Sequence, residues 1–294
     1  MSIRHKAGIS AASGPNSNLG GPIVLVDADN TLWDTDGVFA RAQLALFSAV
    51  EGATGRSSPD ENRLEYVRGF DQAIAERHHL GLRYPPRLLV NAIALALRGL
   101  SRSEAIRRAW NDGSQSGLLV DVVSQIERTF LKMIAEQPDL LPGVLDGLRD
   151  LVSIGATTVV LTEGSRKRVL RTIEHNGLSK YIDRVFEAPK TARMFERVRS
   201  LAKGNQTIYM IGDQFTRDIQ PANEAGIRTI YIPGAFQPKW EAQSEGVHTL
   251  RAPKFDAAVS LILRAEGAHY TQKGDPEDEL LSGPEWNLDV NDRC

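Results

Sequence analysis

The chain has 294 residues, with 35 Lys and Arg against 37 Asp and Glu, for a formal net charge of −2. That length allows one large or two medium domains, and 41% hydrophobic residues suffice for a sizeable core. The balanced charge disfavours a nucleic-acid partner, and no apolar run approaches the ~20 residues that cross a membrane. The single cysteine, Cys294, excludes an internal disulfide or cysteine metal cluster and fits a cytoplasmic location.

The two ends of the chain have the composition of solvated segments. Residues 1–20 are rich in Ser, Gly and Asn and are predicted to be disordered. From Thr271 to Cys294, seven acidic residues stand against two basic ones. We therefore predict an acidic C-terminal tail at 266–294 and expect neither end to hold the chemistry.

Short β-branched runs predict buried strands of a parallel sheet. These runs lie at 23–26, 157–161, 207–211 and 229–232, with a weaker one at 184–186. Helical patterns at 165–176, 191–202 and 216–225 alternate with the later strands, and a glycine closes each pattern. This alternation predicts an α/β fold.

A long helical block interrupts the α/β pattern after the first strand. Helices are predicted at 38–50, 61–79, 87–98, 102–110 and 118–136, with no convincing strand between them. Pro142 and Gly143 mark the return to the α/β unit through a helix at 144–154, and a last helix is expected near 255–263. The chain therefore divides into a core at 21–37 and 141–265 and a helical insertion at 38–140.

Polar residues follow each main strand, where parallel sheets bind their ligands. Asp27-Ala28-Asp29 follows the first strand, Thr162-Glu163-Gly164 the second, and Gly212-Asp213 with Asp218 the strand at 207–211; Lys190 lies near a fourth. Each piece alone is also compatible with an ordinary turn, in which Asp accepts hydrogen bonds from the backbone. An EF-hand is excluded because the required glycine is missing.

In this order, the motifs DADNTL, LTEGS, Lys190 and GDQFTRDI followed by PANEAG resemble those of the haloacid dehalogenase (HAD) superfamily. The helical insertion resembles the C1-type cap of that superfamily. The resemblance covers about residues 23–234 and the expected last helix. It implies a Rossmann-like parallel-sheet core with an inserted all-helical cap domain.

The resemblance implies phosphoryl transfer through an aspartyl phosphate, and the residue chemistry is compatible with it. Asp27 would be the nucleophile, and Asp29 would protonate the leaving alcohol and then deprotonate water. Two carboxylates beside a phosphate repel one another unless a cation intervenes. Mg²⁺ suits the oxygen ligands of Asp27, the Asp29 main-chain carbonyl and Asp213, and Asp218 would hold a metal-bound water or ligate directly.

The phosphate-binding residues are expected to be Thr162, Glu163, Gly164 and Lys190. Thr162 can alternatively be a plain helix cap, and Arg193 is a rival for the role of Lys190. Glu163 departs from the small or amide residue that the superfamily has at this position. A carboxylate so close to a phosphate is unfavourable unless it faces the cap.

Asp29 favours phosphate chemistry, because dehalogenases of the superfamily lack an acid at this second position. We expect a Mg²⁺-dependent phosphatase acting on a small phosphomonoester: a sugar phosphate, a phosphoglycolate-like acid or a nucleoside monophosphate. A phosphomutase and a catalytically silent binding protein are the alternatives. The basic and aromatic segment 77–87 is either a substrate-recognition segment or a solvated helix end, and Trp33 and Phe39 are expected to pack between core and cap.

Overall fold

The computed structural model describes residues 20–76, 84–202, 206–236 and 249–272. The segment predicted to be disordered lies outside these residues except for Gly20, as does the predicted acidic tail beyond Gln272. Helix α10 (Phe255–Gln272) runs past its expected end near 263 and into the predicted tail. No helix of the described chain combines the length and apolar character needed to cross a membrane.

Six parallel strands form one sheet in the order β3-β2-β1-β4-β5-β6. They are β1 (Ile23–Asp27), β2 (Thr157–Thr162), β3 (Arg184–Glu187), β4 (Ile208–Gly212), β5 (Arg228–Tyr231) and β6 (Leu250–Arg251). The chain moves outward from β1 to β3 and then returns to the other side of β1 for β4. The strand order therefore reverses at β1, and this is where such sheets bind ligands. The predicted α/β class is confirmed.

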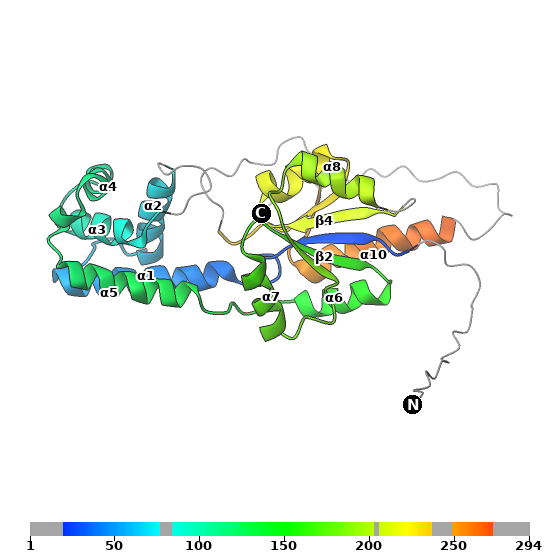
Figure 1. The fold of residues 1–294 in the computed structure, drawn as a ribbon, viewed down its shortest axis with the longest axis horizontal. Coiled ribbons are helices and arrows are strands. Elements are labelled where there is room, and N and C mark those ends of the chain that lie inside the picture. The colour runs from blue at the N-terminus through cyan, green and yellow to red at the C-terminus, as the bar shows by residue number, and fades with distance from the viewer. Residues whose placement is uncertain (1–19, 77–83, 203–205, 237–248, 273–294) are drawn as a thin grey trace, which may run out of the picture.

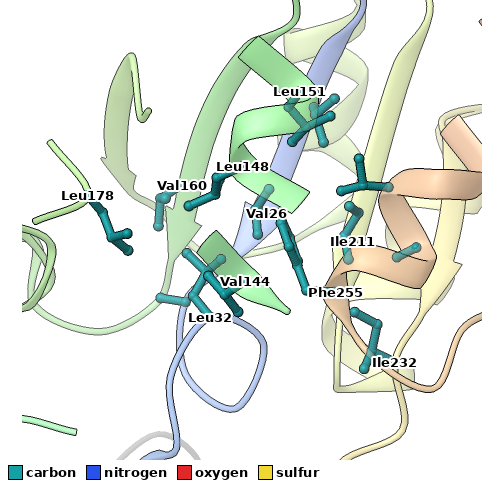
Figure 2. Packing of buried hydrophobic residues seen from close by; sticks show 14 of the residues in the cluster. Val26, Leu32, Val144, Leu148, Leu151, Val160, Leu178, Ile211, Ile232 and Phe255 are labelled. Carbon is teal, nitrogen blue, oxygen red and sulfur yellow. The ribbon is translucent and has the colours of Figure 1, made fainter. Parts of the chain in front are cut away.

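Helices cover both faces of the sheet (Figure 1). Helices α6 (Val144–Ser153), α7 (Arg166–His175) and α10 contribute to the hydrophobic cluster on one face. Helices α8 (Ala192–Leu201) and α9 (Gln220–Glu224) contribute to the cluster on the other. Figure 2 shows the first cluster, in which Phe255 of α10 lies among Val26 and Ile211 of the sheet and Val144 and Leu148 of α6.

The helical insertion between β1 and β2 has a hydrophobic core of its own. It contains α1 (Thr35–Thr54), α2 (Arg63–Ala75), α3 (Pro86–Leu97), α4 (Arg102–Asn111), a 3₁₀ turn (Gly113–Ser116) and α5 (Val120–Ile134). Helices α1 and α5 pack along each other and connect this insertion to the sheet (Figure 1). The insertion is a C1-type cap, as predicted, and α1 begins three residues before the expected boundary at 38.

The predicted helix at 216–225 is wrong in detail. The structure has a π-helix, η2 (Phe215–Ile219), followed by the short helix α9. The amide of Gln220 bonds to the carbonyl of Phe215, five residues back, and Pro221 has no amide hydrogen to continue a regular ladder. Such widened turns are frequent at functional sites, and this one carries Asp218.

The two-residue strand β6 was not predicted, because Leu250 has polar neighbours and lacks a β-branched run. Its pairing with Ile230 and Tyr231 of β5 defines it instead. Helix α2 ends at Ala75 rather than 79, and residues 77–79 of that prediction lie outside the described chain. The remaining predicted helices agree with the structure to within a few residues at their ends.

Replacing Phe255 by alanine tests the packing of α10 against α6. Phe255 is 2% exposed, and a Cβ on Gly147 would lie 2.7 Å from its ring. We expect Phe255→Ala to lower the free energy of unfolding by about 3–5 kcal/mol, because it leaves a cavity in the main core. Urea unfolding followed by circular dichroism measures the loss. Val152→Ala, at an exposed site on α6, should change it by no more than about 0.5 kcal/mol; equal losses would contradict this account.

Candidate active site

Three carboxylates converge at the carboxyl ends of β1 and β4. Asp27 is the last residue of β1, Asp213 directly follows β4, and Asp218 lies in η2. One oxygen from each carboxylate lies within 4.8 Å of the others, and all three side chains are buried. We call these three residues the carboxylate cluster. Its hard oxygen atoms can hold a divalent cation.

Asp218 is fixed in this cluster by its backbone surroundings. It is completely buried, and its Oδ2 accepts a hydrogen bond of 3.0 Å from the amide of Gln214. Gly212 has no side chain in the space that this carboxylate fills, where a Cβ would overlap it. The glycine at the end of β4 and the widened turn of η2 therefore act together to place Asp218.

Asp213 contains an unsatisfied acceptor. Its Oδ1 is buried and has no hydrogen-bond partner within the described structure. Buried polar atoms are rarely left without a partner. This orphaned oxygen beside two further carboxylates fits a bound cation, so the residues present are compatible with the predicted Mg²⁺ site.

Lys190 joins two members of the carboxylate cluster. Its Nζ donates hydrogen bonds to Oδ1 of Asp27 and, at 2.5 Å, to Oδ1 of Asp218. Its side chain is only 5% exposed. The alternative residue, Arg193, is exposed on α8. Lys190 therefore supplies the ammonium group that the sequence pattern predicted beside Asp27.

Burial dominates the ionisation of the cluster. Burial and the charge of Asp218 raise the pKa of Asp27 to about 7, against the opposing effect of Lys190. Burial, Asp27 and Asp218 raise the pKa of Asp213 to about 9. Burial acts to lower the pKa of Lys190, but Asp218 and Asp27 outweigh it and the net shift is upward. A cation would favour the ionised carboxylates and reverse this tendency.

Asp29 belongs to a turn beside the cluster rather than to the cluster itself. Asn30 adopts a left-handed conformation (φ 59°), which asparagine tolerates, and this turns the chain after β1. Oδ1 of Asp29 accepts hydrogen bonds from Trp33 Nε1 (3.1 Å) and Thr35 Oγ1 (2.5 Å). The predicted cation contact through its main-chain carbonyl stays a prediction.

Trp33 and Thr35 are site residues whose bonds to Asp29 the sequence analysis missed. Trp33 was expected only to pack between core and cap, and it is indeed buried against the sheet cluster. Its indole N–H also donates a hydrogen bond to Asp29, which the sequence analysis did not predict. Thr35 begins α1, so the helix that leads into the cap starts at a residue bonded to Asp29.

Thr162 lies at the end of β2, one position beyond the residue paired with Asp27. It is buried, and its Oγ1 accepts a 2.9 Å hydrogen bond from the amide of Gly164. The hydroxyl proton is left to donate to a ligand, whereas the Gly164 amide is used within the loop. Ser165 is the N-cap of α7, so Thr162 is not the helix cap considered as an alternative.

Glu163 connects loops that follow three different strands. Its Oε1 accepts a 3.0 Å hydrogen bond from the backbone amide of Lys190, and its Oε2 pairs with Nη1 of Arg217 at 2.8 Å. The carboxylate is thus engaged with donors on both sides. Its predicted part in substrate binding stays untested, but the structure shows that it braces the Lys190 loop.

The basic segment predicted at 77–87 is described only in part, since residues 77–83 lie outside the described chain. Within the remainder, the hydroxyl of Tyr84 donates to Asp71, and Arg87 lies 3.8 Å from Glu127. These described contacts hold the start of α3 within the cap.

The reversed sheet order, the helical insertion after β1 and the carboxylate cluster together define a capped parallel α/β core with a candidate cation site at the reversal point. The family model for haloacid dehalogenase-like hydrolases matches residues 22–226. The chain therefore belongs to this family, which confirms the resemblance seen in the motifs. A comparison with curated proteins found no match.

Solved structures share the fold at low sequence identity. A haloacid dehalogenase-like family hydrolase from Xanthomonas campestris matches with a TM-score of 0.57 and 18% identity, covering 86% of this chain and 99% of its own. YfnB of Bacillus subtilis, described as a HAD-hydrolase and solved with magnesium, matches with a TM-score of 0.52 and 14% identity, covering 84% and 99%. These likenesses establish the fold and no more.

The raised pKa values predict how pH changes stability. Without a cation, folded Asp27 and Asp213 hold protons that their unfolded forms release near pH 4. Their stabilising contribution is therefore complete below about pH 4 and is lost as pH rises through about 7 and about 9. In chelator, we expect the free energy of unfolding to fall by about 4–5 kcal/mol between about pH 6 and about pH 8.5, because Asp27 and Asp213 lose their protons in this range.

Thermal unfolding with EDTA and with Mg²⁺ at both pH values checks this expectation. Mg²⁺ should raise Tm more at the higher pH, because it binds ionised carboxylates. Asp213→Asn should weaken both the pH dependence and the effect of Mg²⁺. A wild-type Tm that rose with pH in EDTA, or a Mg²⁺ effect equal at both pH values, would contradict the assignment.

Proposed function

We propose that this protein is a Mg²⁺-dependent phosphatase that hydrolyses a small phosphomonoester through an aspartyl phosphate on Asp27. The carboxylate cluster with Lys190 is the observation that carries the proposal. Phosphoryl transfer requires a nucleophile, a cation and fixed donors around the phosphate oxygens. Asp27, the carboxylate cluster, and Lys190 with Thr162 supply these three requirements at one edge of the sheet.

In the proposed reaction, a carboxylate oxygen of Asp27 attacks phosphorus and the bond to the leaving alcohol oxygen breaks. Asp29 gives that oxygen a proton. Asp29 then takes a proton from the water that attacks the aspartyl phosphate, which releases inorganic phosphate and restores Asp27. The second acid, Asp29, is also what favours phosphate esters over carbon–halogen bonds.

Lys190 and Thr162 would hold the transferred group. Lys190 already neutralises Asp27 and lies within reach of a phosphate there. The Thr162 hydroxyl has its proton available for a phosphate oxygen. Mg²⁺ held by Asp27, Asp213, Asp218 and the Asp29 carbonyl would neutralise phosphate charge and help to orient the ester.

A phosphomutase on the same core is the second possibility, and it differs in the fate of the aspartyl phosphate. Its cap would exclude water and let a bound intermediate take the phosphoryl group back. Free phosphate among the products supports hydrolysis, while an isomerised ester supports the mutase. A catalytically silent binding protein is disfavoured by the intact set of Asp27, Asp29, Asp213 and Lys190.

Substitution of the nucleophile tests the proposal. Phosphate release from a generic aryl phosphate should require Mg²⁺, and Asp27→Asn should lower it by at least about a thousandfold, because an amide cannot form the phosphorylated intermediate. Asp146→Asn, at an exposed ion pair on α6, is the matched control and should retain wild-type activity. Activity that survived Asp27→Asn would exclude Asp27 as the nucleophile.

The brace formed by Glu163 yields a second prediction. Glu163→Ala removes the acceptor for the Lys190 amide and should lower kcat by about tenfold, since small displacements of catalytic groups are costly. Glu163→Gln keeps a carbonyl oxygen for that amide and should recover kcat to within about threefold. Steady-state kinetics on the same ester measures both variants. If glutamine fails where alanine fails, the negative charge rather than the hydrogen bond is what matters.

A further inference from the structure

Arg68 is a cap residue that contacts the core beside the active site. It lies on α2, and its guanidinium carbon is 4.1 Å from the centroid of the Phe236 ring. Phe236 belongs to the segment that follows β5. A Cβ on Gly234 in the same segment would lie 3.4 Å from Oδ2 of Asp213. The segment under Arg68 therefore borders the carboxylate cluster.

The charge of Arg68 acts on Asp36, an acidic residue close to Asp29. Burial raises the pKa of Asp36, the charge of Arg68 lowers it, and Asp29 is among the charges that raise it. The pKa of Asp36, at the start of α1, is therefore affected by the charges of both Arg68 and Asp29. The main positive charge on Asp27 and Asp213 comes instead from Lys190. Arg68 is therefore a second cation, set apart from the position that would hold the transferred phosphate.

The guanidinium of Arg68 has unused donors. Among the residues that the structure describes, it makes no hydrogen bond or salt bridge and stacks on the Phe236 ring. Its charge also acts on Asp71 of α2, but that carboxylate accepts its hydrogen bonds from Gln43 and Tyr84. Arg63, on the same helix, also stacks on a phenylalanine, Phe47, but it pairs with Glu51 at 2.7 Å. An arginine fixed by an aromatic face and free at its donor edge is suited to a planar carboxylate or a phosphate.

We propose that Arg68 binds a second anionic group of the substrate, so that the preferred substrates are phosphate esters bearing a carboxylate or a further phosphate. This inference rests on the proposed phosphatase function and narrows its substrate class. It favours a phosphorylated acid or a bisphosphate over an ester whose remainder is uncharged. The cap would then recognise the remainder of the substrate, while the core would bind the transferred phosphate.

The test compares esters that share one carbon skeleton. The two-carbon esters are ethyl phosphate, phosphoglycolate and ethylene glycol bisphosphate, whose second group is neutral, a carboxylate or a phosphate. The corresponding three-carbon esters place that second group farther from the transferred phosphate. With Mg²⁺, wild-type protein should hydrolyse at least one anionic ester with kcat/KM about tenfold or more above that of its neutral counterpart. The carboxylate and phosphate arms show which anion is preferred.

Arg68→Gln should remove that preference by raising KM for the anionic ester. We expect kcat/KM to fall about tenfold to a hundredfold for the preferred anionic ester and to stay within about threefold for the neutral one. Arg68→Lys should retain part of the preference, since the charge remains but the planar fork is lost. Arg63→Gln, the matched control on α2, should leave the preference unchanged.

A binding experiment separates this inference from the phosphatase proposal. Calorimetry with Mg²⁺ compares methylphosphonate with phosphonoacetate, and ethylphosphonate with 3-phosphonopropionate, none of which requires turnover. The carboxylate should tighten binding to wild type in at least one pair, and Arg68→Gln should abolish the gain. Hydrolysis of neutral esters without any anionic preference, or a carboxylate gain unchanged by Arg68→Gln, would overturn the inference and leave the phosphatase proposal intact. An Arg68-dependent gain without turnover would support the subsite and count against the phosphatase.

Discussion

The fold is organised around the burial of three carboxylates with one ammonium group at the edge of the sheet. Removing such charges from water costs several kcal/mol each unless partners are fixed around them. Lys190 supplies one partner for Asp27 and Asp218, while Asp213 keeps an orphaned oxygen. A divalent cation would balance the remaining negative charge, and without one, burial and the neighbouring carboxylates raise the pKa values of Asp27 and Asp213.

Several structural details hold the carboxylate cluster and Lys190 in place. Gly212 leaves space for the carboxylate of Asp218, and η2 turns that carboxylate inward. Glu163 accepts the Lys190 amide and pairs with Arg217, which joins three loops into one support. The carboxylate of Glu163, which departs from the usual residue of the family, is thus engaged by two donors.

The cap meets the site through residues at the start of α1 and along α2. Thr35 bonds to Asp29, Asp36 follows it in the first turn of α1, and Arg68 contacts Phe236 on the core. The cap has its own hydrophobic cluster, so its packing does not depend on these polar contacts.

Much of the fold could be predicted from the sequence because the signals are local. The β-branched runs at 23–26 and 157–161 favour buried strands, and glycines mark helix ends by their conformational freedom. The two-residue β6 and the π-helix η2 could not be predicted. Pairing with β5 defines the first, and the second arises where Pro221 breaks the amide ladder beside a buried aspartate.

For the site, the sequence by itself determined the identity of the charged residues and the strands that carry them, because their spacing after each strand is a local property. Only the tertiary structure decided that Lys190 rather than Arg193 reaches Asp27, and that Thr162 is no helix cap. The contact of Arg68 with Phe236 is also tertiary. These contacts form only when whole helices and loops pack together, so the local sequence around each residue does not reveal them.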